Sequence, residues 1–241
     1  RLSAEDLKRV KDEARRESAV AAMRETLDGV AHDLRTPVSR LRLAAEGGLN
    51  GAHEPAALRE ALEDCLEESA RVCETLDLLM DLAEAEAGGM RLSLTEWDTR
   101  AALSEAAELL ADAAEEKGVN LEIPEGIGPT VKADRRRVRQ ALVNLVENAV
   151  KYASPGGHVV LDAARIGRGV RLSVRDDGPG VGPEERERIW DRLYRGEAGR
   201  TGRGLGLGLS VVRAIAKAHG GEAGQAPADG GGSLFWLDLP A

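Results

Sequence analysis

Apolar side chains in the first part of the chain recur at alternating intervals of three and four residues. This alternation places them along one face of a helix and is typical of helices that pack in bundles. One stripe ends before residue 46, and a longer one, with Ser69 as its single polar member, begins after residue 55. The stripes consist of Leu27, Ala31, Leu34, Val38, Leu41 and Ala45, and of Leu58, Leu62, Cys65, Ser69, Val72, Leu76, Leu79 and Ala83.

Glycine and proline indicate where these helices begin and end. The run Gly47-Gly48-Leu49-Asn50-Gly51 predicts the end of the first helix, Pro55 suits the first turn of the second, and Gly88-Gly89 predicts its end. Two helices joined by a short turn form an antiparallel hairpin, which cannot bury both apolar faces alone. The sequence therefore predicts a homodimer whose two hairpins form a four-helix bundle. A bundle completed within one chain is the alternative, but the sequence offers no further helix with a comparable heptad pattern.

Beyond Gly89 the pattern changes to short strand-like segments separated by helical ones. We expect strands at Met90–Leu94, Val119–Ile123, Thr130–Ala133, His158–Ala163, Val170–Val174 and Leu234–Leu239. We expect helices at Thr99–Lys117, Arg135–Tyr152, Pro183–Asp191 and Leu207–Ala218, with Asp98 and Asp134 as N-caps of the first two. This succession predicts a sheet with helices on one face, an α/β sandwich, so the fold class of the whole chain is α+β.

The composition narrows the classes of function. Hydrophobic residues make up 42% and charged residues 31% of the 241 residues, as in folded globular proteins. The net charge of −9 argues against broad nucleic-acid binding, which requires neutralisation of phosphates. The sequence has no apolar run of about 18 residues, the length of a membrane span. Because it begins at Arg1, we expect a fragment, with any sensor or membrane segment upstream.

The first candidate chemical group is His32, which lies beside the apolar stripe and is expected to reach solvent. A neutral imidazole nitrogen is a nucleophile, and the adjacent Asp33 can orient the other ring N–H. Thr36 lies one helical turn further on the same face, where its hydroxyl can orient a water molecule. Pro37 predicts a bend just past the reactive residue. A lone exposed histidine is unremarkable, so the combination His-Asp-x-x-Thr-Pro is what favours a phosphoryl acceptor.

A second group lies on the predicted helix Arg135–Tyr152. Asn144, Asn148, Lys151 and Tyr152 share one face of that helix. Amide oxygens suit magnesium, which takes few protein ligands, and a lysine suits phosphate oxygens. A solvated polar stripe is the alternative interpretation if this face is considered alone.

Two glycine-rich segments follow. Asp176-Asp177-Gly178-Pro179-Gly180 comes directly after a predicted strand, where a carboxylate can accept a hydrogen bond from an amino group and glycines let the backbone approach a ligand. Gly202-Arg203-Gly204-Leu205-Gly206 opens into a helix whose N–H groups suit phosphate. It is no dinucleotide fingerprint, because no strand immediately precedes it.

These four segments, in this order, resemble the bacterial sensor histidine kinases of two-component systems, from about residue 25 to the C-terminus. The resemblance implies a dimeric helical phosphotransfer domain and a GHKL (Bergerat) ATPase sandwich, shared with gyrase, mismatch-repair and heat-shock chaperone ATPases. It implies that His32 is the phosphoryl acceptor, Asp33 its acidic helper and Thr36 a phosphatase-type hydroxyl. It also implies Mg²⁺ and ATP as cofactors, a response regulator receiver domain as partner, and no nucleic-acid partner.

The same resemblance assigns the nucleotide pocket. Asn144 and Asn148 match the asparagine block, with Asn148 the first candidate magnesium ligand and Asn144 the second. Asp176 matches the aspartate that recognises the adenine amino group. The implied nucleotide-binding residues are Asn144, Asn148, Lys151, Tyr152, Asp176, Gly178, Gly180, Arg195, Gly202, Gly204, Leu205 and Gly206.

The segment 189–195 resembles the lid of these kinases, but Trp190 and Leu193 stand where phenylalanines are usual. The resemblance divides the chain into a signalling linker helix (1–24), a dimerisation and phosphotransfer hairpin (25–88) and a catalytic ATP-binding domain (89–241). It places this part in the cytoplasm, with the full-length protein in the inner membrane.

Two other functions are weighed. One is an ATPase of the same sandwich type that drives clamping, which has no use for an exposed nucleophile such as His32. The other is a scaffold that has lost ATP binding, which the intact asparagines, Asp176 and glycine run disfavour.

Overall fold

The structure, a computed structural model, describes residues 34–49, 55–86, 90–126, 128–196 and 206–240. The chain divides into two compact units, Arg1–Asp77 and Leu78–Ala241.

The first unit contains the predicted helical hairpin. Residues 34–49 are helical, and α2 spans Pro55–Glu86, with its last turns in the second unit. The Cys65 thiol donates to the Leu41 carbonyl at 3.6 Å, and a Cβ on residue 48 would lie 3.3 Å from Ala61. Residues later in the first helix thus meet residues earlier in α2, which confirms an antiparallel pair.

One boundary in the hairpin differs from the expectation. The first helix does not end at Gly47 but continues through Gly48 to Leu49. Glycine weakens a helix by only about 1 kcal/mol per residue, so two of them do not have to end one. Gly48 also packs against α2, where the side chains of Leu58 and Ala61 leave little room.

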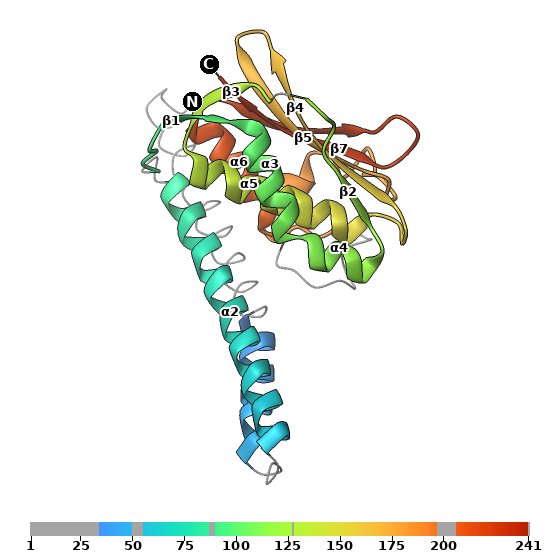
Figure 1. The fold of residues 1–241 in the computed structure, drawn as a ribbon. Helices are drawn as coiled ribbons and strands as arrows, with labels where there is room; N and C mark the ends of the chain where they lie inside the picture. Colours follow the sequence, from blue (N-terminus) through green and yellow to red (C-terminus); the bar gives the residue numbers. More distant parts are fainter. Residues whose placement is uncertain (1–33, 50–54, 87–89, 127, 197–205, 241) are drawn as a thin grey trace, which may run out of the picture. The chain divides into compact units, whose positions relative to one another are not determined.

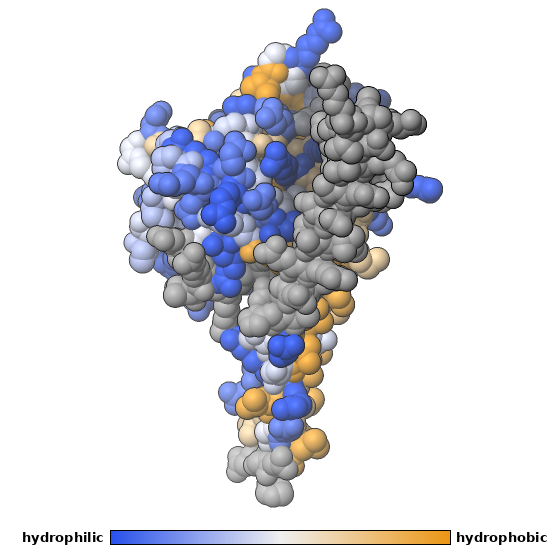
Figure 2. Space-filling model, turned by 180° about the vertical axis from the view of Figure 1, so that it is seen from behind, coloured by the Kyte–Doolittle hydropathy of each residue, from blue (hydrophilic) through white to orange (hydrophobic). Residues whose placement is uncertain are grey.

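The hairpin leaves many of its large apolar side chains exposed within one chain. Figure 2 shows them as hydrophobic patches along the helical hairpin. They include Val38, Leu58, Leu62 and Leu76 from the two stripes, and Leu43 and Leu66 outside them.

The second unit is built on a five-stranded sheet with the order β2-β4-β5-β7-β6. Strands β2 and β4 are parallel, and the other neighbours are antiparallel. A separate antiparallel pair joins β1 to β3. The strands are β1 (Thr95–Asp98), β2 (Asn120–Glu122), β3 (Thr130–Ala133), β4 (His158–Ile166), β5 (Gly169–Asp176), β6 (Glu222–Pro227) and β7 (Ser233–Leu239).

Helices cover one face of this sheet, as Figure 1 shows for α3, α5 and α6. They are α3 (Thr99–Leu109), α4 (Ala111–Lys117), α5 (Arg135–Tyr152) and α6 (Gly208–Ala218), and a short 3-10 helix, η1, spans Arg188–Trp190. Alternate strand residues meet the buried faces of the helices, which confirms the predicted sandwich. Fully buried members of this core include Leu103, Leu142, Leu145, Leu161, Leu172, Ile215 and Leu237.

Helix α5 begins and ends where the sequence predicts. Its N-cap is Asp134, whose carboxylate accepts from the Arg137 N–H at 3.0 Å. The predicted N-cap Asp98 likewise accepts from the Arg100 N–H at 2.9 Å at the start of α3.

Three predicted elements are wrong. Met90–Leu94 is not a strand, and the first strand, β1, begins at Thr95. In the predicted segment the Ser93 N–H donates to the Asp134 carboxylate at 2.8 Å instead of pairing with a neighbouring strand. The helix expected at Thr99–Lys117 is divided at Leu110, whose φ of −105° and ψ of 6° are not helical. The helix expected at Pro183–Asp191 consists of turns and the short η1.

Strand β6 was not predicted. Its sequence, Glu-Ala-Gly-Gln-Ala-Pro, has no β-branched or aromatic residue, and all its residue types except Gln are depleted in strands. It lies at the sheet edge, where proline is tolerated. Pairing with β7, which does have the alternating pattern, makes it a strand.

Candidate nucleotide-binding site

The site is built around Asp176, the last residue of β5. Along this strand the side chains of Val170, Leu172 and Val174 point to the helix-covered face, and Asp176 is the next in that series. A carboxylate thus occupies a position where the alternation of the strand would place an apolar side chain. Asp176 is only 4% exposed. Burial raises the pKa of Asp176, while the backbone N–H groups of Gly178 and Ser233 partly oppose the rise.

The carboxylate of Asp176 has acceptor capacity to spare. Its Oδ1 accepts from the Gly178 N–H at 2.9 Å. Two carboxylate oxygens offer about four acceptor positions, more than the two backbone donors occupy. A buried carboxylate with remaining acceptor capacity is suited to bind an amino group.

Two glycines let the backbone pack closely beside Asp176. A Cβ on residue 178 would lie 2.4 Å from the Tyr152 carbonyl oxygen, and one on residue 232 would lie 2.0 Å from the Asp176 carbonyl oxygen. Gly178 therefore brings the turn after β5 against the end of α5. Gly180, with φ +76°, continues that turn in a conformation that favours glycine.

Helix α5 brings the predicted polar face to the same place. Asn144, Asn148, Lys151 and Tyr152 are half-buried, and the opposite face of the helix is in the core. The Asn144 Nδ2 donates to the Gln140 carbonyl at 3.1 Å, and a Cβ on residue 208 would lie 3.0 Å from Asn144 Oδ1. The oxygen of Asn144 thus faces the start of α6.

Lys151 and Arg195 place two cations near Tyr152. The Lys151 Nζ lies 5.1 Å from the centre of the Tyr152 ring. Burial lowers the pKa of Lys151, the nearby Arg195 lowers it further, and Glu147 raises it. Because two mutually repelling cations at a half-buried site are stabilised by an anion, this region suits phosphate groups.

The lid segment is fixed at both ends by packing. Trp190, 8% exposed, packs edge-on against Phe235 with ring centres 6.2 Å apart, so the residue that replaces the usual phenylalanine is held in the core. The Tyr194 hydroxyl donates to Glu185 at 2.9 Å. Leu193 has φ of +58°, which is strained for leucine, and its N–H donates to the Gly206 carbonyl at 3.1 Å.

Gly206 is required at the far end of the lid. Its φ is +68°, and a Cβ would lie 2.6 Å from the Tyr194 carbonyl oxygen. The structure therefore places this predicted site residue against the backbone of residues 193–194.

Several predicted site residues lie outside the described residues. These are His32 and Asp33 in the hairpin, and Gly202, Gly204 and Leu205 in the lid. Thr36 is described and is exposed on the first helix, as expected.

The amide oxygens of Asn144 and Asn148 are neutral oxygen donors of a kind that magnesium can take as ligands. Among the described residues, no three His, Cys, Asp or Glu side chains are grouped so that they could hold a metal. Magnesium needs few protein ligands when phosphates and waters supply the rest.

Two residues that support the site were missed in the sequence. Asp177 accepts from the N–H groups of Ser154 at 3.2 Å and His158 at 2.9 Å, and so holds the loop between α5 and β4. Lys117 donates to the last turn of α5. Asp177 could have been identified from the sequence, because it lies in the same motif as Asp176. No sequence motif points to Lys117.

Comparison with known families agrees with both units. Residues 22–88 match the model of the His Kinase A (phospho-acceptor) domain. Residues 133–241 match the model of histidine kinase-, DNA gyrase B- and HSP90-like ATPases. The chain belongs to the sensor histidine kinases of two-component systems.

Relatives among the sensor histidine kinases match most of this chain. SenX3 of Mycobacterium tuberculosis is 33% identical over 224 residues, which are 92% of this chain and 54% of SenX3. The probable sensor protein PcoS of Escherichia coli is 34% identical over 210 residues, 86% of this chain and 45% of PcoS. The chain thus spans about half the length of these relatives.

Solved structures have the same fold. The full-length kinase ShkA in complex with AMPPNP is 29% identical, with a TM-score of 0.66 over 93% of this chain and 45% of that one. The histidine kinase AdeS of Acinetobacter baumannii has a TM-score of 0.69 over 87% of this chain and 97% of that one; at 23% identity it shows the fold alone.

These matches confirm the predicted family and the α+β fold class. They also confirm the predicted enzyme class, because the family is one of ATP-dependent protein-histidine kinases. In the parts that the structure describes, no helix has both the length and the hydropathy of a membrane span.

Proposed function

We propose that this chain is a kinase core that binds Mg-ATP and transfers the γ-phosphoryl group to His32. The observation that carries this proposal is Asp176, a buried carboxylate with spare acceptor capacity at the end of a central strand. An adenine amino group is the donor that such a carboxylate suits. The ATPase family match and the AMPPNP complex of the ShkA relative support the nucleotide.

The triphosphate lies along the α5 face in this proposal. Lys151 and Arg195 supply positive charge, and the start of α6 lies beside Asn144. Asn148, with Asn144, holds the magnesium ion, which neutralises charge on the phosphates. The glycines Gly202, Gly204 and Gly206 contribute phosphate contacts in this proposal, and they lie within the residues that match the ATPase family.

The acceptor is His32, within the residues that match the phospho-acceptor domain. A ring nitrogen lone pair of neutral His32 forms the N–P bond, the bond from the γ-phosphorus to the bridging oxygen breaks, and ADP leaves. Asp33 accepts the hydrogen bond of the other ring N–H and stabilises the charge that develops on the ring. Positioning and charge neutralisation then account for most of the acceleration.

The product and the hairpin define the partners. A phosphohistidine is suited to pass its phosphoryl group to an aspartate in the receiver domain of a response regulator. Thr36, exposed one turn after His32, positions a water that attacks the phosphorus of the regulator's aspartyl phosphate, which breaks the bond to the carboxylate oxygen and releases inorganic phosphate. The exposed apolar side chains of the hairpin support a homodimer.

The proposed organisation follows the sequence interpretation. Residues 1–24 form a signalling linker, 25–88 the phosphotransfer hairpin and 89–241 the ATP-binding domain. This part works in the cytoplasm, within a longer protein of the inner membrane.

Incubation with ATP labelled at the γ-phosphate tests the proposal. The wild type is expected to acquire label that is acid-labile and base-stable, His32→Gln to acquire none, and His158→Gln, which changes an exposed histidine of β4, to remain labelled. Label that survives in His32→Gln would refute the acceptor assignment. ATP turnover without any phosphoprotein would instead favour a clamping ATPase.

A further inference from the structure

The C-terminus of α5 has an unusual cap. The helix ends at Tyr152, and the next residue, Ala153, turns to an extended conformation with φ −54° and ψ 149°. The Ala153 N–H still donates to Ala149 at 2.8 Å. A helix that ends this way has no left-handed glycine to satisfy its last carbonyl groups, so those groups need other donors.

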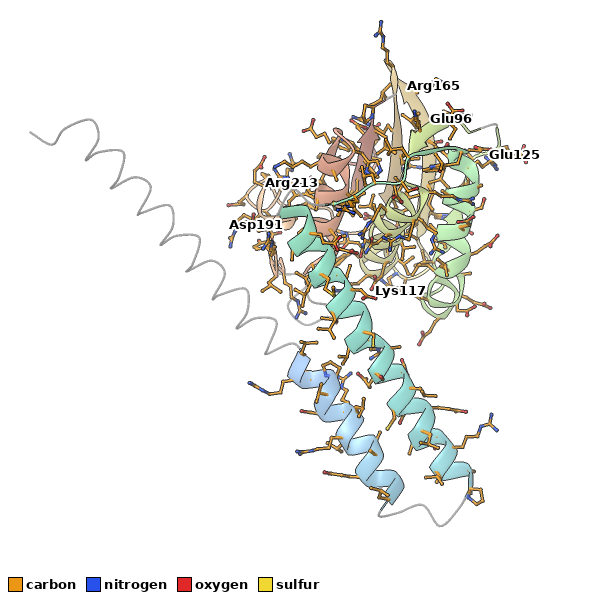
Figure 3. All side chains as sticks on the ribbon, turned by 90° about the vertical axis from the view of Figure 1, so that its left-hand side faces the viewer. Glu96, Lys117, Glu125, Arg165, Asp191 and Arg213 are labelled. Atoms are coloured by element: carbon orange, nitrogen blue, oxygen red, sulfur yellow. The ribbon has the colours of Figure 1, made fainter. Side chains whose placement is uncertain are left out.

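Lys117 supplies these donors from another helix. Its Nζ lies 2.9 Å from the Val150 carbonyl oxygen and 2.5 Å from that of Lys151. Lys117 is the last residue of α4, which Gly118 ends in a left-handed conformation with φ +70°. Its ammonium also meets the negative end of the α5 dipole. Figure 3 labels Lys117 near one end of this unit, with Arg165, on β4, at the other.

The carbonyl groups that Lys117 binds lie within the candidate site. The Lys151 ammonium is close enough to Arg195 for the two charges to repel, and the next carbonyl, that of Tyr152, lies against Gly178. Gly178 in turn donates to Asp176. A shift of the last turn of α5 would therefore displace Lys151 and Tyr152 relative to the Asp176 carboxylate.

We propose that Lys117 is a positioning residue of the nucleotide pocket, which fixes the last turn of α5 so that Lys151 and Asp176 can bind one nucleotide together. This inference rests on the proposed function, because it assigns Lys117 to the ATP site. Lys117 does not contact the nucleotide, so its effect is on affinity rather than on the chemical step.

Titration calorimetry with Mg-ADP on the full chain tests this role. Lys117→Met keeps the length of the side chain and removes the donors, and its dissociation constant is expected to rise about tenfold. Lys117→Arg, which can donate to both carbonyl groups, is expected to remain within about twofold of the wild type. Lys132→Met, at an exposed lysine of β3, is the matched control and should bind like the wild type.

A second readout separates positioning from simple stabilisation. In autophosphorylation assays, Lys117→Met should raise the KM for ATP and leave kcat within about twofold, because bound nucleotide reaches the same transition state. If Lys117→Met does not fold, Lys117→Gln, which has a shorter amide donor, replaces it. Its dissociation constant for Mg-ADP should lie between that of Lys117→Arg and ten times that of the wild type.

The outcomes distinguish the two claims. A wild type that binds no Mg-ADP would overturn the proposed function and this inference together. If the wild type binds Mg-ADP, two results would overturn the role of Lys117 alone. One is a folded Lys117→Met variant that binds as well as the wild type, and the other is a Lys117→Arg variant that binds as weakly as Lys117→Met.

Discussion

Arg137 and Asp81 form an ion pair that is nearly closed to solvent, with side chains 5% and 16% exposed. Gln140 strengthens it by donating to the second oxygen of Asp81 at 2.6 Å. Glu84 approaches the other guanidinium nitrogen at 3.3 Å, but its side chain is 53% exposed. Through these contacts the last turns of α2 are joined to the first turns of α5, the helix that carries the asparagines.

Removal of Asp81 should therefore destabilise the second unit strongly. Asp81→Ala leaves the Arg137 charge buried without its main partner, at a cost of about 3–5 kcal/mol. Glu84→Ala is the control and should cost less than about 1 kcal/mol, because that carboxylate is mostly exposed. Urea denaturation followed by tryptophan fluorescence measures this, since Trp97, Trp190 and Trp236 all lie in the second unit. Equal effects of the two variants would show that the pair adds little.

Adenine recognition by Asp176 should depend on pH. Burial raises the pKa of this carboxyl, and only its ionised form is a full acceptor for an amino group. ATP affinity should thus be complete above the raised pKa and decline as the pH falls through it, earlier than an ordinary aspartate would allow. The measurement is Mg-ADP binding across acidic pH in buffers where the protein stays folded.

The chemistry of the base gives a sharper test of Asp176. Asp176→Asn should weaken ATP binding by about ten- to a hundredfold, because a charged acceptor is replaced by a neutral amide. Guanine carries an oxygen where adenine carries its amino group, so the wild type should prefer ATP to GTP. The variant should lose most of that preference, and an unchanged ATP-to-GTP ratio would exclude Asp176 from base recognition.

Lys151 should control the alkaline limb of nucleotide binding. Burial, then Arg195, lowers its pKa, whereas a bound phosphate favours the charged form. The contribution of Lys151 to affinity is therefore complete below its lowered pKa in the free protein and is lost as the pH rises through it. Lys151→Gln should bind about tenfold more weakly at neutral pH, and its affinity should no longer decline in that alkaline range. A wild type and variant with parallel alkaline profiles would contradict the assignment.

The parts of the fold that the sequence predicted well have strong local signals. Helix α5 was predicted to the residue, because Asp134 caps one end and the apolar periodicity is regular up to Tyr152. Strand β5 was predicted from alternation, and Asp176 was identified as a carboxylate at the end of that strand, followed by glycines. Two of the errors involve partners far along the chain: β6 exists through its pairing with β7, and Ser93, in the segment wrongly predicted as a strand, donates to Asp134.

The candidate site shows the same division. Asn144, Lys151 and Asp176 were identified from motifs, since each motif is short and local. Lys117 was not, because its role arises only when α4 and α5 pack so that one ammonium meets two carbonyl groups. The distance between the Lys117 ammonium and those carbonyl groups cannot be derived from the sequence alone.

The apolar surface of the hairpin should hold two copies together. Leu62 is 56% exposed within one chain and belongs to the heptad stripe of α2. Leu62→Glu should convert the dimer to a monomer, because a charge in the centre of a helical bundle is costly. Leu109→Glu, at a leucine of α3 that is 59% exposed, should remain dimeric. Sedimentation velocity distinguishes the two, and a dimeric Leu62→Glu would place the interface elsewhere.

Asp177 and Gly157 are in such close contact that their substitutions should not be additive. A Cβ on residue 157 would lie 2.4 Å from Asp177 Oδ1, so Gly157→Ala pushes that carboxylate away from the N–H groups of Ser154 and His158. Asp177→Ala loses the same two hydrogen bonds, at about 1–3 kcal/mol. In the double variant the collision is gone and the bonds are lost only once. Its free energy of unfolding should therefore fall by at least about 1 kcal/mol less than the sum of the single losses, as urea denaturation of the four proteins would measure. Additive losses would mean that Gly157 is needed for a reason other than room for Asp177.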